Sequence, residues 1–206
     1  MFRSIKRFWN RLFGSQSDIS LGIYGPPNAG KSTLANRISE DLTGEELSDV
    51  SEVPHETREV EKKERATLEH NGKKINMNLL DMPGISTKVD FKEFKDYGID
   101  EDEAKTRAKE ATKGVVEAIK WLDDVDACVV IFDATKDPYT QVNVTIVGNL
   151  EAKDIPILIV ANKTDLEEAD PEAVKDAFPQ HPFLAISAKE GENIDKLYEE
   201  ITHRLS

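Results

Sequence analysis

The sequence predicts an α/β domain of three layers, in which helices cover both faces of a mostly parallel sheet of six strands. Short apolar runs alternate along the chain with segments of helical periodicity, which is the pattern of a parallel sheet with helical crossovers. A length of 206 residues suits one such domain with a substantial core. Polar motifs follow several apolar runs, and open α/β sheets bind ligands at the carboxyl ends of their strands.

Residues 1–13 are predicted to form a basic amphipathic helix ahead of this domain. They hold four basic and no acidic residues, and their apolar side chains, four of them aromatic, fall within an arc of about 140°. Such a helix suits the headgroup region of an anionic membrane, and packing against the body or a second copy of the chain is the alternative. A joint follows at 14–18, so we expect a helix and linker over 1–18 and the domain over 19–206.

The overall charge limits the class of partner. The net charge is −13 and the isoelectric point is about 4.8, which disfavours RNA as a partner of the body. The lone Cys128 lies in an apolar run and is expected to be a buried thiol in a reducing compartment. No apolar run approaches the length of a membrane span, so we expect a cytoplasmic protein attached peripherally to a membrane.

The remaining elements follow from periodicity and turn signals. A strand over 19–24 leads into a glycine-bearing loop and a helix that starts at Lys31, and Asn193 is expected to cap the last helix. The segments 42–58 and 85–101 are polar and irregular. The other expected elements are a hairpin of 59–70 and 73–80 about Asn71-Gly72, strands over 126–132, 155–161 and 183–186, and helices over 103–122, 142–150, 171–178 and 194–205.

The loop after the first strand, Gly25-Pro26-Pro27-Asn28-Ala29-Gly30-Lys31-Ser32, fills the pattern G-x-x-x-x-G-K-[ST] between a strand and a helix. Its backbone N–H groups and the helix dipole favour phosphate, Lys31 adds a point charge, and the Ser32 hydroxyl can bind Mg²⁺. The alternative is a plain glycine turn. The predicted phosphate-binding residues are Asn28, Ala29, Gly30, Lys31, Ser32 and Thr33.

A second motif, Asp81-Met82-Pro83-Gly84, follows the second strand of the hairpin. Asp81 is placed to reach the metal through water, and the Gly84 N–H to meet the γ-phosphate. A plain turn is the alternative for this short pattern.

Two further motifs suit a guanine base. Within Asn162-Lys163-Thr164-Asp165, the Asp165 carboxylate can accept from guanine N1–H and N2–H₂, Asn162 can serve N7, and the stem of Lys163 can cover the ring. Ser187-Ala188-Lys189 follows a later strand, and its Ala188 N–H is predicted to donate to guanine O6.

Together these motifs make residues 19–206 resemble a P-loop GTPase, on the segments GPPNAGKS, DMPG, NKTD and SAK. The G-x-P-N-x-G-K-S loop and Thr57-Arg58 resemble the bacterial Era and TrmE group more closely, and the chain looks most like small archaeal Era-like GTPases, one branch of which is linked to membrane vesicle formation. The resemblance implies that Thr57 closes on Mg²⁺ and that Asn28 helps hold K⁺. Glu56 and Met82 depart from the usual threonines of the group.

The resemblance also implies how GTP is hydrolysed. Ile85 stands where Ras-like proteins carry the glutamine that positions water, so intrinsic hydrolysis is expected to be slow. A K⁺ ion at Asn28 would stabilise the developing charge. Lys31, Asn28, Thr57 and Gly84 are therefore the predicted catalytic residues.

Two functions are consistent with these features. The first is a molecular switch that binds a membrane through residues 1–13 and controls an unidentified protein effector. The second is an assembly GTPase for ribosomes, whose basic helix contacts RNA; the aromatic stripe favours the first. An ATP-dependent kinase is disfavoured by Asp165. The sequence does not indicate an oligomeric state.

Overall fold

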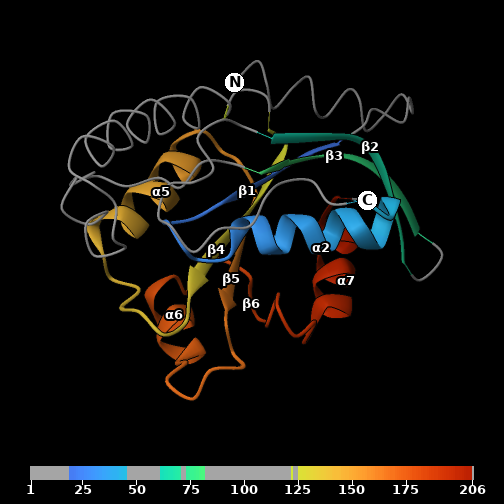
Figure 1. Cartoon of the computed structure of the whole chain (residues 1–206). Coiled ribbons are helices and arrows are strands. Elements are labelled where there is room, and N and C mark those ends of the chain that lie inside the picture. The colour runs from blue at the N-terminus through green and yellow to red at the C-terminus, as the bar shows by residue number, and fades with distance from the viewer. Residues whose placement is uncertain (1–18, 46–60, 71–72, 82–121, 123–124, 206) are drawn as a thin grey trace, which may run out of the picture.

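The computed structural model describes residues 19–45, 61–70, 73–81, 122 and 125–205, which build one six-stranded sheet with helices around it (Figure 1). The predicted helix of 1–13 and nearly all of the helix predicted at 103–122 lie outside these residues. The strands are β1 Ile19–Tyr24, β2 Glu61–His70, β3 Lys73–Asp81, β4 Ala127–Asp133, β5 Ile157–Asn162 and β6 Phe183–Ala185, and the helices are α2 Lys31–Thr43, α5 Gln141–Ala152, α6 Pro171–Ala177 and α7 Ile194–Leu205.

The sheet has the strand order β2-β3-β1-β4-β5-β6. All neighbouring strands run parallel except the edge strand β2, which pairs antiparallel with β3 as the two arms of a hairpin. This confirms the predicted mostly parallel sheet of six strands. Because β1 lies between β3 and β4, the loop after β1 leaves from the middle of the sheet, and Ile23 stands beside Asp81 in the register. Asp133 stands beside Asn162 at the ends of β4 and β5.

Alternate side chains of the strands build two apolar cores, one on each face of the sheet. The strands β4 and β5 are buried on both faces, which explains why they appear in the sequence as short continuous apolar runs. One core joins the sheet to α2 and α7 and includes Leu21, Leu34, Ile38, Val129, Val160 and Leu197. The other joins it to α5 and α6 and includes Tyr24, Val130, Phe132, Ile146, Ile159 and Val174. The domain therefore has the three predicted layers.

The helix ends follow local signals. α6 begins with Pro171 after Asp170, whose carboxylate accepts from the N–H of Ala173 at 3.1 Å. α2 continues to Thr43, two residues into the segment 42–58 that was expected to be irregular, and ends at Gly44, which has φ 76°. None of the helices in the described ranges is long and apolar enough to span a bilayer.

Asn193 occupies the predicted cap position of α7, where its backbone oxygen accepts from the Leu197 N–H at 3.1 Å, but its side chain makes a contact that the sequence did not predict. Asn193 has φ 58°, and its Nδ2 donates to the backbone oxygen of Ala185 at 2.9 Å. Asparagine tolerates this left-handed conformation. The side chain therefore ties the start of α7 back to the end of β6.

Candidate functional site

The loop between β1 and α2 has the backbone shape of a phosphate cradle. Asn28 and Gly30 both have positive φ, 58° and 95°, and the Ala29 N–H donates to the Pro26 oxygen at 3.4 Å. Gly30 caps α2 without a side-chain hydrogen bond, and the first turn of the helix carries no acidic residue. The positive end of the helix dipole and its first amides therefore point toward the loop, which favours an anion there.

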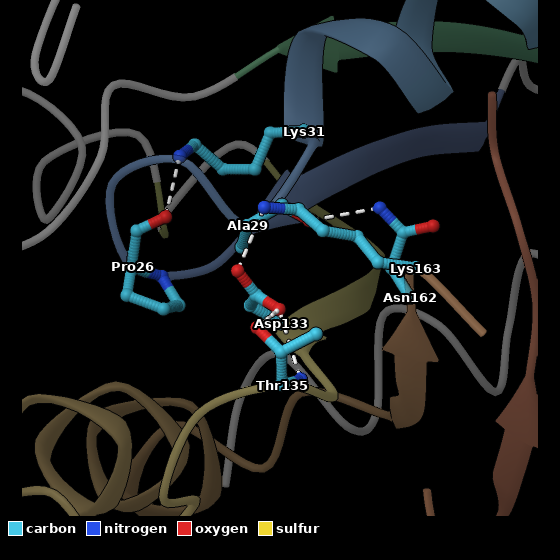
Figure 2. A network of polar contacts seen from close by, with 7 residues as sticks. All are labelled: Pro26, Ala29, Lys31, Asp133, Thr135, Asn162 and Lys163. Carbon is cyan, nitrogen blue, oxygen red and sulfur yellow. Dashed lines mark hydrogen bonds and ion pairs between the residues drawn. The ribbon is translucent and has the colours of Figure 1, made fainter. Parts of the chain in front are cut away.

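Lys31, the first residue of α2, lies over this loop. Its Nζ donates to the backbone oxygen of Pro26 at 3.0 Å, and the residue is almost fully buried (Figure 2). The contact holds the ammonium at the inner side of the loop, where a phosphate group would be bound. Ser32 and Thr33 follow in the first turn of α2.

Asn162 joins the phosphate loop to the loop after β6. The residue ends β5 and is buried; its Nδ2 donates to the Ala29 oxygen at 2.9 Å (Figure 2), and its Oδ1 accepts from the Ala188 N–H at 2.9 Å. A Cβ on Gly30 would stand 2.3 Å from Asn162 Nδ2, so glycine is required at this position by space as well as by its φ. One side chain thus fixes the spacing of two loops. The sequence predicted direct roles on the base for Asn162 and Ala188, and those roles stay predictions.

Asp165 and Ser187, which belong to the two predicted base motifs, are in direct contact. The Ser187 hydroxyl, which is fully buried, donates to Asp165 Oδ1 at 2.6 Å, and its oxygen accepts from the Glu190 N–H at 3.1 Å. Asp165 itself is exposed. Because the Ser187 hydroxyl binds one carboxylate oxygen, the Asp165 side chain presents a fixed acceptor at the surface of the site.

Lys163 contacts Asp133, a residue that the sequence motifs did not include. Its Nζ lies 2.7 Å from Asp133 Oδ2, and Asp133 Oδ1 accepts from the N–H and the hydroxyl of Thr135 at 3.0 and 2.7 Å (Figure 2). Burial alone would raise the pKa of Asp133, but the hydrogen bonds from Lys163 and Thr135 outweigh burial and hold this pKa below its usual value. The signal for Asp133 is an acidic residue at the end of an apolar strand.

Arg37 is a second residue that the motifs missed. It lies on α2, and its guanidinium donates to the backbone oxygens of Ala188 and Lys189 at 2.7 and 2.9 Å. Nothing in the local sequence around position 37 marks this contact, because its partners lie about 150 residues further along the chain.

The predicted metal and switch residues are described only in part. The backbone of Asp81 ends β3 beside Ile23, two residues before the phosphate loop, and this description does not extend to its side chain. Thr57 and Gly84 lie outside the described residues. The structure therefore brings together the phosphate loop, Asn162 to Asp165 and Ser187 to Lys189 at one edge of the sheet.

Comparison with known proteins identifies a family and several relatives with similar sequences. The family model described as 50S ribosome-binding GTPase matches residues 20–163. GTPase Der of Fusobacterium nucleatum is 29% identical over 206 residues, which cover 91% of this chain and 41% of that protein. GTPase Der of Clostridium acetobutylicum is 31% identical over 194 residues, which cover 89% of this chain and 38% of that protein. The chain thus spans less than half the length of these curated relatives.

Solved structures show the same fold. An Era variant of Aquifex aeolicus bound to GDP and AlF₄⁻ superposes with a TM-score of 0.66 at 23% identity, over 89% of this chain and 56% of that one. Era in complex with MgGDPNP and nucleotides of 16S ribosomal RNA gives 0.67 at 22%, over 92% and 57%. Elongation factor SelB of Methanococcus maripaludis with a GTP analogue gives 0.60 at 20%, over 93% and 34%.

Proposed function

Because this chain belongs to the family of 50S ribosome-binding GTPases, we propose that it binds GTP and GDP at the carboxyl edge of its sheet and hydrolyses GTP slowly to GDP and phosphate. The observation that carries the proposal is Asn162, whose carboxamide joins the phosphate loop at Ala29 to the base loop at Ala188. A nucleotide has to contact both loops at once. Loops that are already fixed relative to each other bind it at a smaller entropic cost.

The described residues have separate roles in this proposal. Lys31 and the amides of the phosphate loop bind the phosphates, and Asp165 accepts from the guanine N–H groups. The stem of Lys163, whose ammonium is held by Asp133 at 2.7 Å, lies against the base. Thr57 and Gly84 supply the contacts that sense the γ-phosphate, as the resemblance to Era-like proteins implies. The chain would then act as a switch on an effector that differs in affinity for the two nucleotide states.

The donor set suits Mg²⁺, which prefers oxygen ligands. Ser32 follows Lys31 in the first turn of α2, and the register of β1 with β3 places the backbone of Asp81 next to the strand that enters the phosphate loop. We propose that Ser32 and Thr57 would hold the ion directly and that Asp81 would hold it through water. When bound, the ion neutralises charge on the phosphates.

Hydrolysis is expected to depend on K⁺, because Asn28 offers an amide in the phosphate loop and no glutamine follows Gly84. Exchanging Na⁺ for K⁺ at fixed ionic strength should raise the rate of GTP turnover, and Asn28→Ala should lose most of the increase. Phosphate release at saturating GTP measures both rates. Asn149→Ala, an exposed asparagine on α5, is the control and should keep the full increase. Equal rates in the two salts would remove K⁺ from the proposal.

For the target of the switch we propose a ribosomal particle. The family description names the 50S ribosome, and one of the matching Era structures contains 16S ribosomal RNA. These names conflict with the expectation, drawn from the acidic body and the aromatic stripe of residues 1–13, that RNA is an unlikely partner. The basic segment 1–13 would supply phosphate contacts that the acidic body does not.

A membrane is the second candidate target, and the aromatic stripe of residues 1–13 favours it. In this version the protein is cytoplasmic and attached peripherally to an anionic bilayer. It would belong with the small archaeal Era-like GTPases, and its cellular role would be in vesicle formation. Both of the Der relatives described above are bacterial, which does not support an archaeal grouping.

One experiment separates the two targets. The full chain, and the chain without residues 1–13, would be mixed with ribosomal subunits or with anionic liposomes in the presence of GDP or a GTP analogue. We expect co-sedimentation with subunits that is stronger with the analogue and weakens with salt. Flotation with liposomes and no binding to subunits would transfer the proposal to the membrane. Binding to neither would refute both targets and leave the nucleotide site untouched.

A further inference from the structure

Arg37 connects the helix of the phosphate loop to the loop that follows β6. It lies six positions after Lys31 on α2. Its Nε donates to the Ala188 oxygen at 2.7 Å and its Nη2 to the Lys189 oxygen at 2.9 Å. Two successive carbonyls are therefore bound by one guanidinium, and hydrogen bonds from a charged donor are stronger than those between neutral groups.

The two peptide units that flank the Ala188 Cα are each held by a side chain from another element. The peptide before Ala188 is held through its N–H, which donates to Asn162 Oδ1 at the end of β5, and the peptide after Ala188 is held through its carbonyl, which accepts from Arg37 on α2. The loop then turns at Gly191, which has φ 80° and where an added Cβ would lie 3.4 Å from Arg37 Nη1. The backbone thus passes directly against the guanidinium, and its orientation at positions 188 and 189 depends on it.

The geometry requires arginine in particular. A guanidinium is planar and presents its N–H groups in a fixed fork, so it can bind two carbonyls in a set direction. A lysine at the same place has a single ammonium on a flexible stem and cannot impose that direction. Neutral residues of similar length lack the charge that strengthens both bonds.

We propose that Arg37 is a positioning residue for base recognition: by binding the carbonyl of Ala188 it fixes the peptide that links Ala188 to Lys189, so that the Lys189 N–H on the opposite side of that peptide faces the O6 edge of guanine. The inference rests on the proposed function, because it concerns the base of the same nucleotide. Arg37 would connect the two halves of the site, because the helix that carries Lys31 would also fix the backbone that binds the base. Nucleotides that lack a good acceptor at position 6 should therefore be insensitive to Arg37.

The test compares GDP with 6-thio-GDP, in which the weaker acceptor sulfur replaces O6. Dissociation constants would be measured by calorimetry for the wild type, Arg37→Ala, Arg37→Lys and the control Glu40→Ala, an exposed residue of the same helix. The wild type should prefer GDP. In Arg37→Ala the dissociation constant of GDP should rise by about tenfold or more and that of 6-thio-GDP much less. The preference for GDP over 6-thio-GDP should therefore fall. Arg37→Lys should lose part of the preference and Glu40→Ala none.

Equal weakening of both nucleotides in a folded Arg37→Ala variant would overturn the inference, because Arg37 would then support only the packing of the loop. Circular dichroism and thermal unfolding establish whether that variant folds. If it does not, the Arg37→Lys titrations decide, and an undiminished preference there overturns the inference. A wild type that binds neither nucleotide would overturn the proposed function and this inference with it.

Discussion

Replacing Asp165 by Asn is expected to weaken GDP binding by about 30- to 1,000-fold and to make XDP the better ligand. The loss corresponds to about 2 to 4 kcal/mol for a paired contact to a charged acceptor. The Ser187 hydroxyl donates to Asp165 Oδ1 at 2.6 Å and would keep donating to the amide oxygen of the variant. The amide NH₂ would then face the base, where it opposes the N–H groups of guanine and suits the carbonyl at C2 of xanthine.

Calorimetric titration with GDP and XDP measures this change of preference. Glu167→Gln provides the matched control, since it removes the same charge from an exposed residue two positions away and should leave both affinities unchanged. Unchanged GDP affinity in Asp165→Asn would mean that this carboxylate does not contact the base.

Replacing Gly25 by Ala is expected to lower the free energy of unfolding by about 3 kcal/mol, at the upper end of what overpacking costs. A Cβ at this position would lie 2.2 Å from the backbone oxygen of Ile131 on the neighbouring strand β4. The atom it meets belongs to backbone in the middle of the sheet, so the chain cannot yield by a rotamer change. A domain with a total stability of about 5 to 15 kcal/mol would lose a large part of it.

Urea denaturation followed by circular dichroism measures the loss. Gly148→Ala is the matched control: it lies inside α5, an added Cβ there has no atom within 4 Å, and alanine favours helix over glycine by about 1 kcal/mol. The control should therefore unfold at a slightly higher urea concentration than the wild type. If the Gly25 variant unfolded at the same concentration as the wild type, β1 and β4 would not be packed as described.

Local patterns were sufficient to locate most strands and helices. A strand that is buried on both faces appears in the sequence as a continuous apolar run, so β4 and β5 were predicted to within two residues of their observed bounds. β1 was predicted at its observed bounds, Ile19–Tyr24, and β6 to within one residue. α7 was also predicted at its observed bounds. The end of α2 was missed because the prediction followed apolar spacing, although Gly44, a residue typical just after a helix, was visible in the sequence.

The contacts of the site were harder to predict than its residues. Motifs located Lys31, Asn162, Asp165 and Ser187, because each is defined by neighbours within a few positions. They did not predict that Asn162 would bind backbone groups 133 and 26 residues away. Such contacts depend on the strand order, and no local pattern encodes which strands lie side by side.

The contacts of Lys163 and Arg37 illustrate the same limit. Lys163 was expected to use its stem on the base, and its ammonium is in addition bound by Asp133, which stands beside Asn162 in the register of β4 with β5. Arg37 is one charged residue among many on a helix surface until the fold brings Ala188 and Lys189 against it.

The central claim is that the carboxyl edge of this sheet is a guanine-nucleotide site, and equilibrium titration of the full wild-type chain tests it most directly. GDP, ADP and guanosine would each be titrated in the presence of Mg²⁺. We expect GDP to bind far more tightly than ADP, because guanine presents N1–H and N2–H₂ to Asp165 and adenine has neither, and far more tightly than guanosine, because Lys31 and the phosphate loop bind phosphates. Equal affinity for GDP and ADP, or no binding of GDP, would contradict the central claim.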